Sequence, residues 1–163
     1  MATGQRSRTA ILAGAKIVIA KVGSYESNML DIAEAAQVSR ATVYNHFSDK
    51  EEMLLTLVES EILRLAAVAT KASTKADALY DLSREIANDP ALRRMVVTDP
   101  LDIAKFVTLS NHPLWTLATD SLTRAFGSEN AGLVLHWLMG QVASPLSDTD
   151  SRTQADQIAR ALN

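Results

Sequence analysis

Apolar residues recur at intervals of three and four along this chain, and β-branched runs with a two-residue period are absent. That spacing predicts helices with one buried face, so we expect an all-α protein. Gly23 and four prolines mark helix ends, since proline is tolerated only in the first turn of a helix. The predicted helices span about 6–22, 29–37, 40–47, 48–70, 75–88, 91–97, 100–110, 113–126, 129–144 and 150–162.

The third predicted helix, within QVSRATVYNHF (residues 37–47), has an unusually narrow apolar stripe. At 100° per residue only Val43 and Phe47 face inward, while Ala41 and Asn45 point outward. The outward pair is flanked by Arg40, Thr42, Tyr44 and His46. A helix that only packs usually carries a wider stripe, so this one is predicted to present its polar side to a partner. The alternative is an exposed polar helix without a ligand.

The neighbouring positions predict a helix-turn-helix. Asn28 and Ser39 are suited to cap the second and third helices. Ser48 is suited to start the fourth helix, with Glu51 as its capping-box partner. The second helix ends only two residues before Ser39, so the two helices must cross steeply. That arrangement presents the second helix of the pair to a major groove.

The side chains of this helix suit DNA. Arg40 can bind a guanine edge, Asn45 can pair with adenine, and Ala41 can touch a thymine methyl. Tyr44 and His46 can donate to phosphates, and Lys50 adds a cation at the next helix start. The predicted DNA-binding set is Ser39, Arg40, Ala41, Thr42, Tyr44, Asn45, His46 and Lys50.

Residues 29–54, MLDIAEAAQVSRATVYNHFSDKEEML, resemble the DNA-binding head of the TetR (tetracycline repressor-like) family of bacterial regulators. The matching positions are Ile32-Ala33, Val38-Ser39, Thr42, Tyr44, His46-Phe47, Lys50-Glu51 and Leu54. The resemblance covers about residues 6–55 and implies a homodimer on palindromic operator DNA, usually a repressor released by a small molecule. The family usually has glycine where this chain has Gln37, at the turn's expected left-handed position, and a side chain there costs ~1 kcal/mol.

The expected organisation is a helix-turn-helix DNA-binding domain over residues 1–48 and a helical ligand-binding and dimerisation domain over 49–163. The net charge also differs between the two parts of the chain. Residues 1–50 hold six basic and four acidic residues, a net charge of +2, and the remainder carries −5. A basic working end on an acidic body agrees with a nucleic-acid partner for the head alone.

Residues 130–147 contain no charged side chain. Their polar residues argue against a membrane span, so we expect a helix buried on two sides. The resemblance implies dimerisation through the last two helices. The candidate interface residues are Gly132, His136, Gly140 and Ala143 on one face, with Ile158 and Leu162 from the last helix. The alternative is that both helices simply cover the core of one chain.

An effector site is harder to predict. The resemblance implies a pocket walled by the middle helices, which supply few polar groups and therefore favour a small apolar ligand. Candidates by type and region are Met95, Phe106, Leu109, His112, Trp115, Phe126 and Trp137. The alternative is a DNA-binding regulator without an effector, controlled by a protein partner or by its abundance.

Other functional classes are disfavoured. The chain has no cysteine, and its three histidines lie far apart without a nucleophile motif. The DTD at 148–150 lacks the glycine and glutamate of a calcium loop. We therefore expect no metal, no cofactor and no enzyme activity, a helical enzyme being the remote alternative. With no secretory signal in evidence, the expected location is the cytoplasm.

Overall fold

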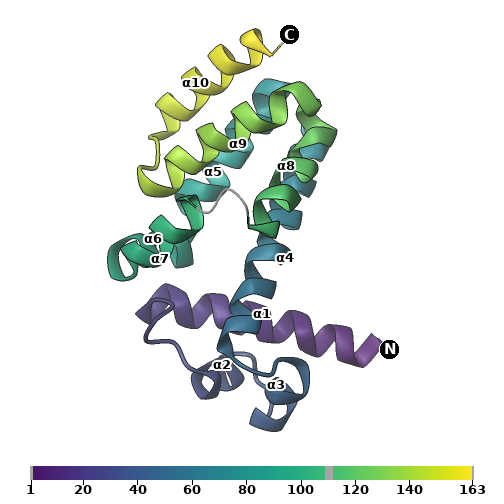
Figure 1. The fold of residues 1–163 in the computed structure, drawn as a ribbon, viewed down its shortest axis with the longest axis vertical. Coiled ribbons are helices and arrows are strands. Elements are labelled where there is room, and N and C mark those ends of the chain that lie inside the picture. The colour runs from purple at the N-terminus through teal and green to yellow at the C-terminus, as the bar shows by residue number, and fades with distance from the viewer. Residues whose placement is uncertain (1, 109–111, 163) are drawn as a thin grey trace. The chain divides into compact units, whose positions relative to one another are not determined.

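The computed structural model describes residues 2–108 and 112–162, and every regular element in that part is an α-helix (Figure 1). The predicted all-α class is confirmed. In chain order the helices are α1 (Ala2–Val22), α2 (Met29–Ala35), α3 (Arg40–His46), α4 (Lys50–Lys71), α5 (Lys75–Asn88), α6 (Pro90–Thr98), α7 (Pro100–Thr108), α8 (Pro113–Phe126), α9 (Ser128–Ala143) and α10 (Asp148–Ala161).

The start of α4 differs from the predicted one. A capping box between Ser48 and Glu51 was expected, and this was wrong by one position. Asp49 Oδ1 accepts from the Glu52 amide at 2.9 Å, and the Glu52 carboxylate accepts from the Ser48 amide at 2.8 Å. The backbone is bent at Ser48 and Asp49, so Lys50 is the first helical residue.

The chain divides into two compact units, each made of two segments. Unit 1 comprises residues 1–59 and 90–103, and unit 2 comprises residues 60–89 and 104–163. Helices α4 and α7 each begin in unit 1 and end in unit 2. Helix α6 lies wholly in unit 1, although 30 residues of unit 2 precede it in the chain.

The core of unit 1 forms around α1, which packs against α2, α3 and α6. The helical spacing predicts Ile11, Ala15, Val18, Ile19 and Val22 on one inward face of α1. The first four are buried, whereas Val22 is exposed beside the glycine that ends the helix. Buried core residues are Ile11, Ala15, Val18, Ile19, Met29, Ile32, Ala33, Val43, Phe47, Met53, Leu57 and Ala91. Helices α1, α2 and α3 thus share one core with α6, a fourth helix from far along the chain.

A glycine sets how closely α1 and α2 cross. A Cβ atom on Gly14 would lie 2.7 Å from the backbone nitrogen of Ala36, closer than real side chains come. Ala36 directly follows α2, at the beginning of the turn. The missing side chain of Gly14 therefore allows the helix-turn-helix to seat on α1.

Unit 2 is built on α5, which packs against α8, α9 and α10, while α8 and α9 pack against each other. Among the described residues, no helix combines the length and the apolar character that crossing a membrane requires. The buried apolar residues of these four helices are Ala78, Leu79, Leu82, Ile86, Ala87, Leu114, Leu122, Phe126, Ala131, Val134, Leu135, Leu138, Val142, Ala155, Ala159 and Leu162.

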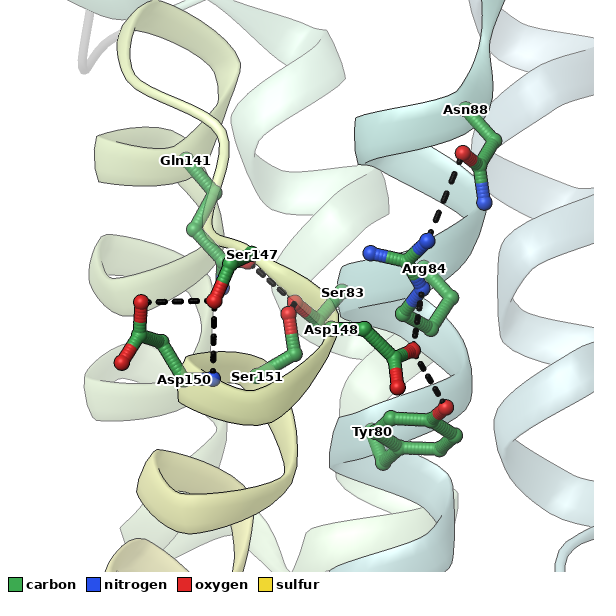
Figure 2. Close-up of polar contacts among 9 residues, drawn as sticks. All are labelled: Tyr80, Ser83, Arg84, Asn88, Gln141, Ser147, Asp148, Asp150 and Ser151. Atoms are coloured by element: carbon green, nitrogen blue, oxygen red, sulfur yellow. Dashed lines mark hydrogen bonds and ion pairs between the residues drawn. The ribbon is translucent and has the colours of Figure 1, made fainter.

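A polar network ties α5, α9 and α10 together (Figure 2). The Ser83 hydroxyl hydrogen-bonds with Gln141 Oε1 and lies 2.8 Å from the Ser151 hydroxyl, and all three side chains are buried. Nearer the surface, Asp148 accepts from Tyr80 at 2.7 Å and pairs with Arg84 at 3.1 Å. The three buried side chains are neutral and hydrogen-bond through Ser83, although Gln141 Nε2 has no partner, and the charged side chains lie nearer the surface.

Candidate nucleic-acid interface

The helix-turn-helix is assembled by local capping. Asn28 Oδ1 accepts from the Leu30 and Asp31 amides, both at 3.0 Å, and so starts α2. Between the helices, Gln37 has a φ of +56°, which confirms the expected left-handed position. Ser39 Oγ then accepts from the Thr42 amide at 3.0 Å and starts α3. Both predicted caps and the turn are therefore confirmed.

Helix α3 divides into a buried and an exposed side. Val43 is fully buried and Phe47, which ends the helix, is 1% exposed, as predicted. Thr42 and His46 are half-buried at the flanks. The exposed side chains are Arg40, Ala41, Tyr44 and Asn45. Two apolar anchors thus orient a helix whose remaining side chains face away from the unit 1 core.

Two of the predicted DNA-binding hydroxyls interact with each other. Ser39 Oγ and Thr42 Oγ1 lie 2.8 Å apart, in addition to the capping bond. Ser39 therefore holds the first turn of α3 in shape. The remaining exposed groups of the helix that can hydrogen-bond are the side chains of Arg40, Tyr44 and Asn45.

The amino-terminal half of α1 supports the end of α3. The Arg8 guanidinium lies 4.7 Å from the centroid of the Phe47 ring and 3.4 Å from the Thr56 hydroxyl. A cation over an aromatic face is attracted by the ring quadrupole, so Arg8 fixes the anchor of α3. The sequence alone does not reveal this role of Arg8, because the contact joins residues far apart in the chain.

Lys50 requires a correction. It was expected to reach a phosphate, but its ammonium donates to the backbone carbonyls of Ser24 at 3.1 Å, Tyr25 at 2.9 Å and Ser27 at 3.0 Å. An ammonium has three N–H donors, and these three carbonyls use all of them. Lys50 therefore holds the α1–α2 loop and has no donor left for DNA in this structure.

Asp99 is a buried charge whose role is not visible in the sequence. Its carboxylate oxygens accept from the Ser24 and Tyr25 amides, both at 3.0 Å, and from the Thr98 hydroxyl at 2.6 Å. Burial raises the pKa of Asp99, but the hydrogen bonds from Thr98, Tyr25 and Ser24 outweigh it and hold the pKa below its ordinary value. Asp99 is therefore an ionised anchor for the same loop that Lys50 grips.

The predicted effector residues do not converge on one site. Met95 packs against the core of unit 1, Phe126 is buried in unit 2, and His112 caps α8 by accepting from the Leu114 amide. The Trp137 indole donates to Gln154 at 2.9 Å. Leu109 and the side chain of Phe106 lie outside the described residues. No group of three His, Cys, Asp or Glu gathers as metal ligands would within the described part of the chain.

The Trp115 ring lies 5.9 Å from the ring of His136, which was predicted for the dimer interface instead. One residue of the predicted effector set, on α8, thus contacts one residue of the predicted dimer interface, on α9. Trp115 is half-buried and His136 is exposed, so their contact lies at the surface of unit 2.

The predicted dimer residues fall into two groups. Leu162 is 7% exposed and already covered within its own chain, so it is not available to a partner as was expected. Ile158 is half-buried. On α9, Gly132 is half-buried, His136, Gly140 and Ala143 are exposed, and a Cβ atom on either glycine would meet nothing within 4 Å. Leu133, 57% exposed, extends this face.

Residues 11–57 match the family model described as bacterial regulatory proteins, tetR family. Over 111 residues the chain is 28% identical to the HTH-type transcriptional repressor AcnR of Corynebacterium glutamicum, covering 62% of this chain and 56% of AcnR. The chain spans about half the length of the curated relatives it matches.

Two solved structures share the fold at low identity. The TetR family repressor AlkX from Dietzia sp. superposes with a TM-score of 0.70 at 18% identity, over 95% of this chain and 94% of AlkX. FadR from Bacillus subtilis, solved with stearoyl-CoA, gives 0.52 at 17% identity, over 94% of this chain and 96% of FadR. The head motif and the fold agree: residues 11–57 carry the match to the tetR family of bacterial regulatory proteins, and the rest of the chain shares the fold of these solved structures.

Proposed function

We propose that the protein is a sequence-specific DNA-binding transcriptional regulator that inserts α3 into the major groove. The observation that carries this proposal is the exposure of Arg40, Tyr44 and Asn45 on a helix held by Val43 and Phe47. Arg40 would read a guanine and Asn45 an adenine, while Tyr44 and His46 would contact phosphates. Ala41 allows close approach to the bases. Ser39 and Thr42 would shape the first turn of α3, and Lys50 would act indirectly through the α1–α2 loop.

The tetR family match of residues 11–57 and the similarity to AcnR, a transcriptional repressor, support a repressor more than an enzyme. In this proposal residues 1–48 are the DNA-binding domain, and residues 49–163 serve dimerisation and effector binding. The repressor would be released from operator DNA when the second domain binds its effector.

The test begins with a duplex selected from random sequence by the wild-type protein. Replacing Arg40 with alanine should weaken binding to that duplex by about 1–3 kcal/mol and relax the preference at one base pair. Arg93 is an exposed arginine on α6 of the same unit, so Arg93→Ala is the matched control and should leave the preference unchanged. Equal affinity for every duplex, unchanged by Arg40→Ala, would contradict the proposal.

A homodimer is the second part of the proposal. The open face of α9, with Gly132, Leu133, His136, Gly140 and Ala143, would pack against its copy in a partner. Small residues on such a face let two helices approach closely, and an uncharged face loses little on desolvation. Two copies of α3 about 34–36 Å apart would then read successive major grooves of a palindrome.

The effector is proposed to be a small apolar molecule. This proposal is supported by the apolar composition of α7 to α9 and by a fold shared with FadR, whose structure holds stearoyl-CoA. A thermal-shift screen of fatty acids and acyl-CoA compounds would find a ligand through stabilisation, which grows with the logarithm of ligand concentration. The candidate residues do not gather at one described site, and this favours the competing proposal of a regulator without an effector. Stabilisation by none of the compounds would support that alternative.

A further inference from the structure

The loop between α1 and α2, residues 23–28, is gripped by two charged side chains of opposite sign. Lys50 binds three of its carbonyls, from Ser24, Tyr25 and Ser27. Asp99 binds two of its amides, from Ser24 and Tyr25. Donors and acceptors of the same short stretch are thus both held by ions, whose hydrogen bonds are stronger than neutral ones.

Lys50 and Asp99 each lie at the start of a helix. Lys50 is the first residue of α4. The Asp99 carbonyl accepts from the Asp102 and Ile103 amides at 3.0 and 3.2 Å, so Asp99 caps α7. Helices α4 and α7 are the two helices that run without interruption from unit 1 into unit 2. Each of them therefore begins with a charge fixed to the α1–α2 loop.

The α1–α2 loop is closely packed against Thr98 and Asp99. Gly23 has a φ of +89°, and a Cβ atom there would lie 2.3 Å from Thr98 Oγ1 and 2.5 Å from Asp99 Oδ2. Asp99 and Ser24 are 7% and 4% exposed. The loop ends at Asn28, which caps α2, and α2 leads through the turn to α3. A shift of either helix start would therefore be passed to the recognition helix.

We propose that Lys50 and Asp99 are positioning residues that couple the state of unit 2 to the placement of α3 through the α1–α2 loop. This inference rests on the proposed DNA-binding function and specifies how that function is regulated. Coupling requires that DNA prefer one arrangement of the clamp, and it is then reciprocal: DNA binding must change unit 2 as much as unit 2 changes DNA binding.

The test compares Asp99→Asn, Lys50→Met and the double variant with controls of equal charge change. Glu26→Gln removes an exposed carboxylate from the same loop, and Lys21→Met removes an exposed ammonium at the end of α1. With the duplex selected by the wild type, each clamp variant should bind about 5–150-fold more weakly, whereas both controls should match the wild type. The double variant should lose little more than either single one, because the loop is released once.

The second readout is amide hydrogen exchange within residues 60–89 and 112–162, with and without a saturating amount of the selected duplex. In the wild type, DNA should slow exchange in these segments, and in the clamp variants that change should disappear although DNA is bound. Lys50→Arg keeps a cation with several donors and should restore part of both effects, which separates the clamp from a general loss of folding.

The outcomes are distinct. A wild type that binds no duplex specifically would overturn the proposed function itself. Specific binding by the wild type, together with clamp variants that keep wild-type affinity and still transmit protection to unit 2, would overturn the coupling alone. If Asp99→Asn and Lys50→Met lose helical circular dichroism, the test rests on Lys50→Arg. Its amide hydrogen exchange with and without the selected duplex must then resemble that of the wild type.

Discussion

Glycine inside a helix serves opposite purposes in the two units. In unit 1, a Cβ atom on Gly14 would collide with the backbone of Ala36, so a contact within the chain requires glycine there. In unit 2, a Cβ atom on Gly132 or Gly140 would meet nothing within 4 Å. Glycine costs a helix up to ~1 kcal/mol relative to alanine. In α1 the close helix crossing explains that cost, whereas in α9 nothing in the single chain does, which favours a partner on that face.

The buried polar groups differ in a parallel way. Unit 1 buries an ionised carboxylate, Asp99, against backbone amides, whereas unit 2 buries the neutral side chains of Ser83, Gln141 and Ser151 against one another. A charge binds a loop strongly but responds to acid, and a neutral network does not. The buried polar contacts of unit 1 therefore depend on ionisation, whereas the buried polar contacts of unit 2 do not.

The largest expected effect is on assembly. Gly140→Leu should convert the proposed dimer to a monomer, because bulk on a close-packed face forces the helices apart. The fold of the single chain should survive, since the position is open. Light scattering measures the mass, with Ala67→Leu, at an exposed position of α4, as a control that should remain dimeric. A dimer of unchanged strength would place the interface elsewhere.

A smaller effect is expected inside the head. Gly14→Ala should lower the free energy of unfolding by about 1–3 kcal/mol, because the added methyl group pushes α1 and α2 apart. The same change at Gly132, measured at concentrations where the chain is monomeric, should raise it by up to ~1 kcal/mol through helix propensity. Urea unfolding of the two variants measures both values. Equal changes in the free energy of unfolding for Gly14→Ala and Gly132→Ala would contradict the proposed difference between the two glycines.

The smallest expected effect is a difference in acid sensitivity. The pKa of Asp99 is lowered in the folded state from its ordinary value of 3.8, so its stabilisation is present above that value and is lost as the pH falls through the lower, folded pKa. Hydrogen bonds from Thr74 and then Arg152 also lower the pKa of Asp77 in unit 2, but that carboxylate is half-exposed and screened by solvent.

Amide NMR signals of Ser24 and Tyr25 should therefore report loosening at a higher pH than those of α5. The variant Asp99→Asn should remove this difference, and Asp77→Asn should not. Simultaneous loss of both sets of signals would mean that the buried carboxylate does not control the acid response.

Local features of the sequence were sufficient to predict the helices and the division of α3 into a buried and an exposed side. Periodicity placed Val43 and Phe47 inward, and the caps at Asn28 and Ser39 were confirmed, because a cap involves atoms only two or three residues apart. The left-handed turn at Gln37 was predicted from the family resemblance, because the family usually has glycine at that position. Where two neighbouring residues could both cap, as at Ser48 and Asp49, sequence alone chose wrongly.

Tertiary structure decided what the buried faces and charged groups contact. Periodicity shows that α6 has an apolar face but not that this face packs on α1, which comes more than sixty residues earlier in the chain. The sequence predicted a phosphate contact for Lys50 and no role for Asp99, yet both side chains bind a loop 23 to 75 residues away. Hydrophobic spacing is a one-dimensional signal, whereas a partner for a charge is set by which distant backbone groups the fold leaves unpaired nearby.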